Sequence, residues 1–111
     1  MTGVQTCALP ICVFVRSVNG IGLAYPDHDP WFNTKLLRAY IDIAPYDPNV
    51  KQYIDVYANY INYAYEHART QEGFFYEDWT GKDPKRASQL LMQDAVIESY
   101  AVLALYYNSQ L

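Results

Sequence analysis

Three Asp-Pro dipeptides divide the chain, and each precedes a stretch in which apolar residues recur with the period of an α-helix. The Asp can cap a helix, as we expect for Asp29, and the Pro fits the first helical turn, where no amide donor is needed. The sequence therefore predicts three helices, at residues 31–44, 48–70 and 88–107. Apart from the few residues 74–76, no alternating run predicts a strand, so the expected fold class is all-α.

The two connections between these helices differ greatly in length. Only residues 45–47 separate the first two helices, and so short a turn makes them antiparallel. The longer segment 71–87 precedes the third helix. If this helix is antiparallel to the second, segments 13–30 and 71–87 lie at the same end of the bundle. Binding residues concentrate in loops held by a rigid scaffold, so we expect a site at that end.

The third predicted helix carries two further expectations. Residues 95–105 are apolar nearly all round apart from Glu98 and Ser99, a pattern typical of a helix buried on most sides. One of Gln93 and Asp94 is expected to bond a neighbouring helix or to face a central cavity. Three such helices have more apolar surface than they can hide from one another, so we also expect the tyrosine-rich stripe of the second helix to pack on further helices.

Composition and charge exclude several classes of partner. The chain has 8 Lys and Arg against 12 Asp and Glu, a net charge of −4, which predicts no nucleic-acid partner. No apolar run is long enough to predict a transmembrane segment. Of the two histidines, His28 and His67, neither has a His or Cys partner at the spacing of a zinc site. We therefore expect no metal ion and no cofactor.

The first residues of the chain, MTGVQTCALPI, resemble the in-frame translation of a sequencing adapter. We therefore expect residues 1–11 to be a non-native scar and residues 12–111 to be the protein's own sequence. On this interpretation the native N-terminus, with any signal peptide, is missing. Cys7 lies inside the scar and Cys12 at its border, so neither indicates a disulfide.

Two segments resemble glycoside hydrolase family 76. One is the loop GFFYEDWTG at residues 73–81, followed by SQLLMQDA at 88–95, and the other is YPDHDPWFNTKLLR at 25–38. The resemblance covers about residues 15–107, in the same order and spacing. It implies an (α/α)6 toroid of helical hairpins and an endo-acting α-1,6-mannanase that cleaves the mannan backbone with retention of configuration.

On this resemblance, residues 12–111 are the C-terminal part of a single truncated glycoside hydrolase domain, and they supply three helices of the toroid. The resemblance implies that the parent protein takes α-mannan as its carbohydrate substrate. It also implies that the parent is extracellular, periplasmic or attached to the cell surface. The helices predicted from the periodicity agree with this fold class.

The family's catalytic pair is two consecutive aspartates, and no Asp-Asp occurs in this sequence. No catalytic residue is carried over, and the chain alone is expected to be inactive. Retaining hydrolysis needs two carboxyl groups about 5–5.5 Å apart across the scissile bond. Glu77-Asp78 is the one adjacent acidic pair, and neighbours in an extended segment point to opposite sides. Only a kinked loop would aim both at one sugar; otherwise they bond sugar hydroxyls or the loop's own amides.

The expected substrate-binding residues are aromatic and polar groups of the two long loops. Trp79, with Phe75 and Tyr76, either offers stacking faces to mannose rings or plugs the loop onto the helix ends. Trp31 either faces substrate or packs as a core staple. The predicted set is Asp27, His28, Trp31, Tyr76, Glu77, Asp78 and Trp79.

Two other functions stay open. Helical toroids also form other glycosidases, such as unsaturated uronyl hydrolases, and Lys82, Lys85 and Arg86 are a weak match for uronate carboxylates. The alternative from another class is a non-catalytic helical interaction module, which buries its apolar stripe on a protein partner. The absence of a sequence repeat and the presence of the aromatic loop count against the module.

Overall fold

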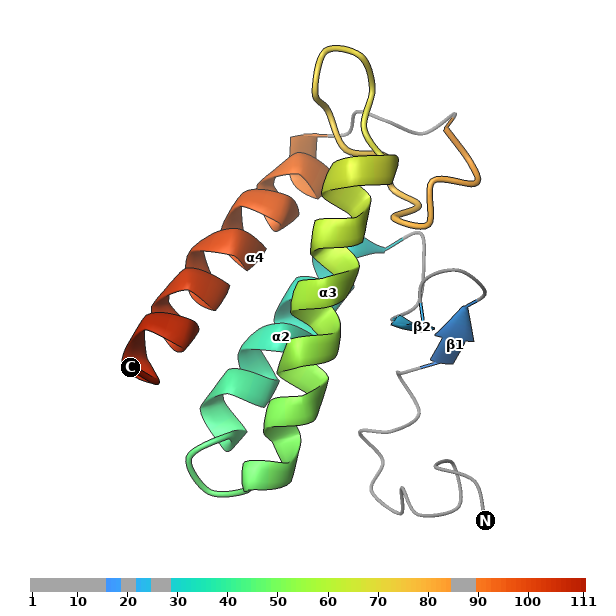
Figure 1. Ribbon diagram of the computed structural model, residues 1–111. Coiled ribbons are helices and arrows are strands. Elements are labelled where there is room, and N and C mark those ends of the chain that lie inside the picture. Colours follow the sequence, from blue (N-terminus) through green and yellow to red (C-terminus); the bar gives the residue numbers. More distant parts are fainter. Residues whose placement is uncertain (1–15, 19–21, 25–28, 85–89) are drawn as a thin grey trace.

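The structure, a computed structural model, describes residues 16–18, 22–24, 29–84 and 90–111. Over these residues the chain forms three α-helices, α2 (Pro30–Ile43), α3 (Lys51–His67) and α4 (Leu90–Ser109) (Figure 1). The expected mainly helical chain is confirmed. The proposed scar at 1–11 and the expected site residues Asp27 and His28 lie outside the described residues.

A small β-hairpin precedes the helices and is an addition to the all-α fold that the sequence analysis did not predict. Strands β1 (Arg16–Val18) and β2 (Gly22–Ala24) pair antiparallel, with Ser17 opposite Leu23. Strands this short do not show the alternation of apolar and polar residues on which the prediction relied. The Asn19-Gly20 pair between them in the sequence is the signal that would have predicted a hairpin.

Two of the Asp-Pro helix starts are confirmed. The Asp29 carboxylate accepts a hydrogen bond of 2.9 Å from the backbone N–H of Phe32 and caps α2. Asp47 accepts one of 3.0 Å from the N–H of Asn49 and begins the 3-10 helix η2 (Pro48–Val50), which leads directly into α3. The third start, predicted at residue 88, lies outside the described residues.

The first two helices are arranged as the length of their connection predicted, and the third has the direction that the sequence analysis considered as a condition. The short turn after α2 makes α2 and α3 antiparallel, and α4 runs back antiparallel to α3 along α2 (Figure 1). The end of α3 and the starts of α2 and α4 therefore share one end of the bundle. The hydroxyl of Thr34, in the second turn of α2, lies 3.1 Å from the carbonyl oxygen of Ala95 near the start of α4.

The core lies between the helices and includes the tyrosine stripe of α3. Tyr57 and Tyr60 are 0% and 1% exposed. The expectation that this stripe needs further helices is therefore corrected, because α2, α4 and the loop after α3 cover it. The other large core residues include Leu37, Tyr40, Val50, Ile54, Ile61, Phe75, Trp79, Val96, Leu103 and Tyr106.

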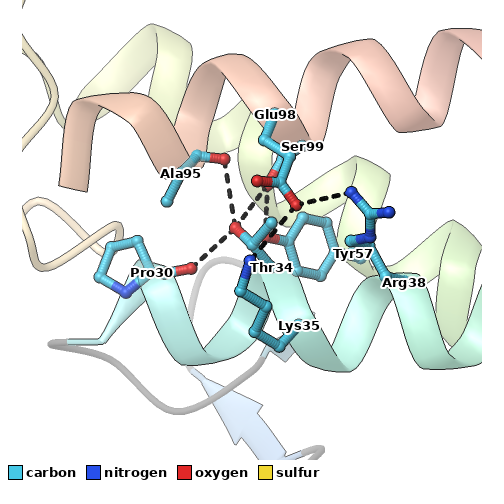
Figure 2. Close-up of polar contacts among 8 residues, drawn as sticks. All are labelled: Pro30, Thr34, Lys35, Arg38, Tyr57, Ala95, Glu98 and Ser99. Atoms are coloured by element: carbon cyan, nitrogen blue, oxygen red, sulfur yellow. Dashed lines mark hydrogen bonds and ion pairs between the residues drawn. The ribbon is translucent and has the colours of Figure 1, made fainter. Parts of the chain in front are cut away.

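A buried hydroxyl cluster joins the three helices (Figure 2). The Oγ atom of Ser99 in α4 lies 2.8 Å from the hydroxyl of Tyr57 in α3 and 3.0 Å from Oγ1 of Thr34 in α2. Thr34 also lies 2.9 Å from the carbonyl oxygen of Pro30. All three side chains are fully buried. Because each hydroxyl has a partner in the cluster, none bears the full cost of burying a polar group.

Candidate functional site

The segment between α3 and α4 begins with a tight reversal of the chain, which projects beyond the end of α3 (Figure 1). Arg69 and Phe75 form an antiparallel bridge, and the N–H of Tyr76 donates to the carbonyl oxygen of Ala68 at 2.8 Å. Gly73 lies at the turn with a φ of +102°, which glycine adopts without strain. These backbone bonds end α3 at His67, before the predicted residue 70.

The side-chain amide of Gln93 in α4 fixes this reversal to the bundle. Its Nε2 donates to the carbonyl oxygen of Phe75 at 2.8 Å, and its Oε1 accepts from the N–H of Phe75 at 3.0 Å. One of Gln93 and Asp94 was expected to bond a neighbouring helix or to face a central cavity, and the structure shows instead that Gln93 bonds the backbone of a loop. Asp94 is exposed. The two bonds satisfy both backbone groups of a residue whose side chain is 8% exposed.

The second half of the segment is organised by the carboxylate of Asp78. Its Oδ1 accepts from the N–H and the hydroxyl of Thr80, at 2.9 and 2.6 Å, and its Oδ2 accepts from the N–H of Asp83 at 3.2 Å. The residue is 4% exposed. Of the two roles expected for this carboxylate outside a dyad, the structure supports the bonding of the loop's own amides.

The acidic pair is placed poorly for hydrolysis. Glu77 and Asp78 are 5% and 4% exposed, and Asp78 uses both carboxylate oxygens within the loop. A hydrolytic dyad must present both carboxyl groups to one sugar. The burial of both residues and the bonds of Asp78 within the loop disfavour the dyad.

Trp79 lies in the core, which corrects the expectation that its ring offers a face to a sugar. It is 1% exposed, and its ring meets those of Tyr57 and Tyr60 edge to face, with centroids 5.8 and 5.5 Å apart. Phe75 is buried as well, at 8% exposure. Both rings attach the loop to the helices, because burying the large apolar surface of an aromatic ring is more favourable than leaving that ring exposed to water.

Gly81 allows the loop to approach the end of α3 closely. Its φ is +78°, and a Cβ atom there would lie 2.5 Å from the carbonyl oxygen of His67. No larger residue fits this contact without a shift of the backbone. Gly81 thus holds the buried Trp79 against the tyrosines of α3.

Several aromatic side chains remain accessible at this end of the bundle, among them Phe32 in α2 and Tyr65 in α3, at 44% and 46% exposure. Phe74 is 51% exposed, and Tyr76 and Trp31 are partly buried. Trp31 lies in the first turn of α2, and the Nζ atom of Lys35 lies 3.9 Å from its ring centroid, a cation–π contact. Of the seven predicted binding residues, the structure thus leaves Tyr76 and Trp31 accessible. It buries Glu77, Asp78 and Trp79 in one loop and does not describe Asp27 and His28.

Two other kinds of site are absent from the part of the chain that the structure describes. In residues 29–84 and 90–111, no three His, Cys, Asp or Glu side chains are placed to hold a metal ion. None of the helices described is both long and apolar enough to cross a membrane.

A groove of about 580 Å³ lies at the opposite end of the bundle, where α2 and α4 end. No sequence pattern predicts this groove, because it forms between residues that are distant in the sequence. Its wall is mainly apolar. The residues that line it include Ile41, Ala44, Pro45, Pro48, Val102, Leu105 and Tyr106.

No protein-family model, curated protein or solved structure matches this chain. The resemblance to glycoside hydrolase family 76 therefore rests on the two sequence segments at 25–38 and 73–81. The physical basis for a function is the anchored loop at 68–84 and the aromatic side chains that stay accessible beside it.

Proposed function

We propose that this chain is the C-terminal part of a family 76-type glycosidase acting on α-1,6-mannan, and that it supplies a sugar-facing loop without the catalytic carboxylates. The structural observation that carries the proposal is the anchoring of loop 68–84. Gln93 ties it to α4, and Asp78 ties its second half together. Phe74 and Tyr76 are thereby held at a defined place.

A fixed loop suits carbohydrate binding for an energetic reason. An aromatic side chain stacks on the apolar face of a sugar ring, and the contact is favourable only if ordering the loop costs little. In this loop the ordering occurs on folding, through the buried rings of Phe75 and Trp79. Tyr76 also brings a phenolic hydroxyl, which can exchange hydrogen bonds with sugar hydroxyls.

The toroid is part of the same proposal. Three helices are described, and α4 leaves Ile97 and Leu105 at 68% and 72% exposure. In a longer protein, further helical hairpins would cover such a face, and the 111-residue chain by itself leaves it open. The catalytic pair would then come from those other hairpins, because Asp78 uses both carboxylate oxygens within its own loop and Glu77 is buried.

The second candidate is a helical interaction module, and the exposed side of α4 favours it. An apolar helix face of this kind is typical of a protein interface. The structure gives less support to the alternative of an unsaturated uronyl hydrolase than to the interaction module. Lys82 is exposed, but Lys85 and Arg86 lie outside the described residues.

The test is a calorimetric titration of the chain with an α-1,6-linked mannose oligosaccharide. We expect weak binding, and we expect Phe74→Ala and Tyr76→Ala each to weaken it by about three- to ten-fold, the loss typical of one aromatic contact. Tyr46→Ala is the matched control, because Tyr46 is 89% exposed in the turn at the other end of the bundle. Absent binding, or equal weakening by Tyr46→Ala, would contradict the proposal, and preference for a uronate oligosaccharide would favour the alternative toroid enzyme.

A further inference from the structure

Helix α4 buries one side only, although residues 95–105 predicted burial on most sides. Ala95, Ser99 and Leu103 face the core, and the opposite side is open to solvent. α4 lies at the edge of the bundle, with α2 and α3 on the same side of it (Figure 1). We call the open side the outer α4 face, made of Leu91, Asp94, Ile97, Ala101, Leu105 and Asn108, all of which are exposed.

Five of the six residues of the outer α4 face, all except Leu91, are arranged symmetrically about Ala101. Ile97 and Leu105 lie four residues before and after Ala101, and both are apolar. Asp94 and Asn108 lie seven residues before and after it, and both are polar and able to form a hydrogen bond with each other. Ile97 and Leu105 are 68% and 72% exposed. Ala101 at the centre has a small side chain, which allows another helix to approach closely.

This symmetry is what an antiparallel pair of identical helices requires. A two-fold axis at Ala101 places each residue opposite the one equally far on the other side, so Ile97 meets Leu105 and Asp94 meets Asn108 of the second copy. We propose that two copies of this chain associate through their outer α4 faces in this antiparallel arrangement. The inference concerns the 111-residue chain and does not rest on the proposed glycosidase function.

Charge favours the antiparallel arrangement over a parallel one. In a parallel pair Asp94 would lie opposite Asp94, and the two carboxylates would repel each other. In the antiparallel pair the two Asp94 side chains lie about 21 Å apart along the helix axis, and each carboxylate faces an amide donor. Glu98, at the margin of the face, already pairs with Arg38 at 3.1 Å and Lys35 at 3.7 Å within its own copy (Figure 2).

The size of the face predicts a dimer that dissociates on dilution. α4 has 20 residues and is about 30 Å long. A single pair of helices of this length buries less than the roughly 1,600 Å² of a standard stable interface. The apolar groove beside Leu105 adds open space next to the contact, into which side chains of the second copy fit.

The first test is analytical ultracentrifugation of the full chain over a range of concentrations. We expect the mass to rise from 12.8 kDa toward twice that value as the concentration increases. Ala101→Arg should keep the chain monomeric, because it places a large charged side chain on the axis. The matched control is Ala39→Arg, since Ala39 is also exposed on a helix and lies in α2. Circular dichroism verifies that both variants fold.

The second test uses charge exchange on the outer α4 face. Asn108→Asp places a carboxylate opposite Asp94 twice per dimer and should weaken association at least ten-fold at low salt. Adding Asp94→Lys to that variant creates two ion pairs and should restore association. This rescue would not occur in a parallel pair or through another face.

Several results would overturn the dimer. A chain that stays monomeric up to about 1 mM, the weak limit of specific association, would do so. So would a dimer that Ala101→Arg leaves intact, or a loss of association in Asn108→Asp that Asp94→Lys does not rescue. A monomer whose outer α4 face binds a separate helical segment would assign the face to that segment instead.

Discussion

The hydroxyl oxygens of Tyr57 and Ser99 lie 2.8 Å apart in the interior, and this contact joins α3 to α4. Ser99 is also 3.0 Å from Oγ1 of Thr34, so one small side chain connects all three helices. In the sequence, Ser99 is one of two polar residues in a nearly apolar run. The cluster explains its presence there and sets the register of α4 against the other two helices.

Ser99→Ala should destabilise the chain by about 1–3 kcal/mol, because it leaves the buried hydroxyls of Tyr57 and Thr34 without their shared partner. The free energy of unfolding in urea measures this loss. Ser109→Ala is the control, since its hydroxyl bonds the carbonyl oxygen of Tyr106 at the exposed end of α4. The cluster would be unimportant for stability if the two variants lost the same amount.

Stability should fall in alkaline solution through Tyr57. Burial raises the pKa of Tyr57 from 10.0 to about 12, because the charged phenolate is poorly solvated in the core. Because the pKa is raised in the folded state, the contribution of protonated Tyr57 to the free energy of unfolding is complete below pH 10. It is lost as pH rises from 10 toward 12. The loss attributable to Tyr57 is about 2 kcal/mol at pH 12.

Urea unfolding of the wild type and of Tyr57→Phe between pH 9 and pH 12 isolates this effect, because other tyrosines titrate in both proteins. We expect the free energy of unfolding of the wild type to fall relative to that of Tyr57→Phe as pH rises. A difference that does not change with pH would show that Tyr57 ionises equally in the folded and unfolded chain.

Gly81→Ala should be more destabilising than Gly73→Ala. Both glycines have positive φ, at +78° and +102°, so either substitution introduces backbone strain of about 1–3 kcal/mol. Only at Gly81 does the added Cβ meet the carbonyl oxygen of His67, whereas at Gly73 the nearest atom is the end of the Arg69 side chain, 3.9 Å away. Thermal unfolding compares the two, and an equal loss would contradict the close approach at Gly81.

Gln93→Ala should release the loop without unfolding the helices. The variant removes both partners of the Phe75 backbone, so the Phe75 amide should exchange with solvent at least ten-fold faster while the amides of α3 keep their protection. Gln110→Ala is the control, because Gln110 is exposed at the end of the chain. Hydrogen exchange followed by NMR measures this. If the exchange rate of the Phe75 amide did not change, the chain reversal after α3 would be ordered without the side chain of Gln93.

The helices could be predicted from the sequence because their signals are local. Asp29 and Asp47 cap the helices that they precede, and the apolar period marks the extent of each helix. The hairpin of β1 and β2 was missed because its strands are too short to carry a period. Which side of α4 faces the core depended on Thr34 and Tyr57, which are distant in the sequence.

The loop residues were harder to place. The loop contains aromatic and acidic residues of the kinds that bind ligands. Whether each of these side chains contacts a ligand or stabilises the loop depends on whether it is exposed or buried. Trp79 packs on tyrosines of α3, and Asp78 bonds amides that follow it. Both arrangements depend on how closely the chain returns to α3 at Gly81, and a glycine in the sequence does not specify that distance.

The most direct test of the proposed function is an NMR titration of the chain with an α-1,6-linked mannose oligosaccharide. We predict shifts that concentrate at Phe74, Tyr76 and Trp31, with no signals of shortened oligosaccharide on prolonged incubation. Shifts at these residues would show that the oligosaccharide binds at the proposed loop. The absence of shortened oligosaccharide would agree with the absence of a catalytic pair. Shifts confined to other surfaces, an absence of shifts, or hydrolysis of the oligosaccharide by this chain alone would contradict the account.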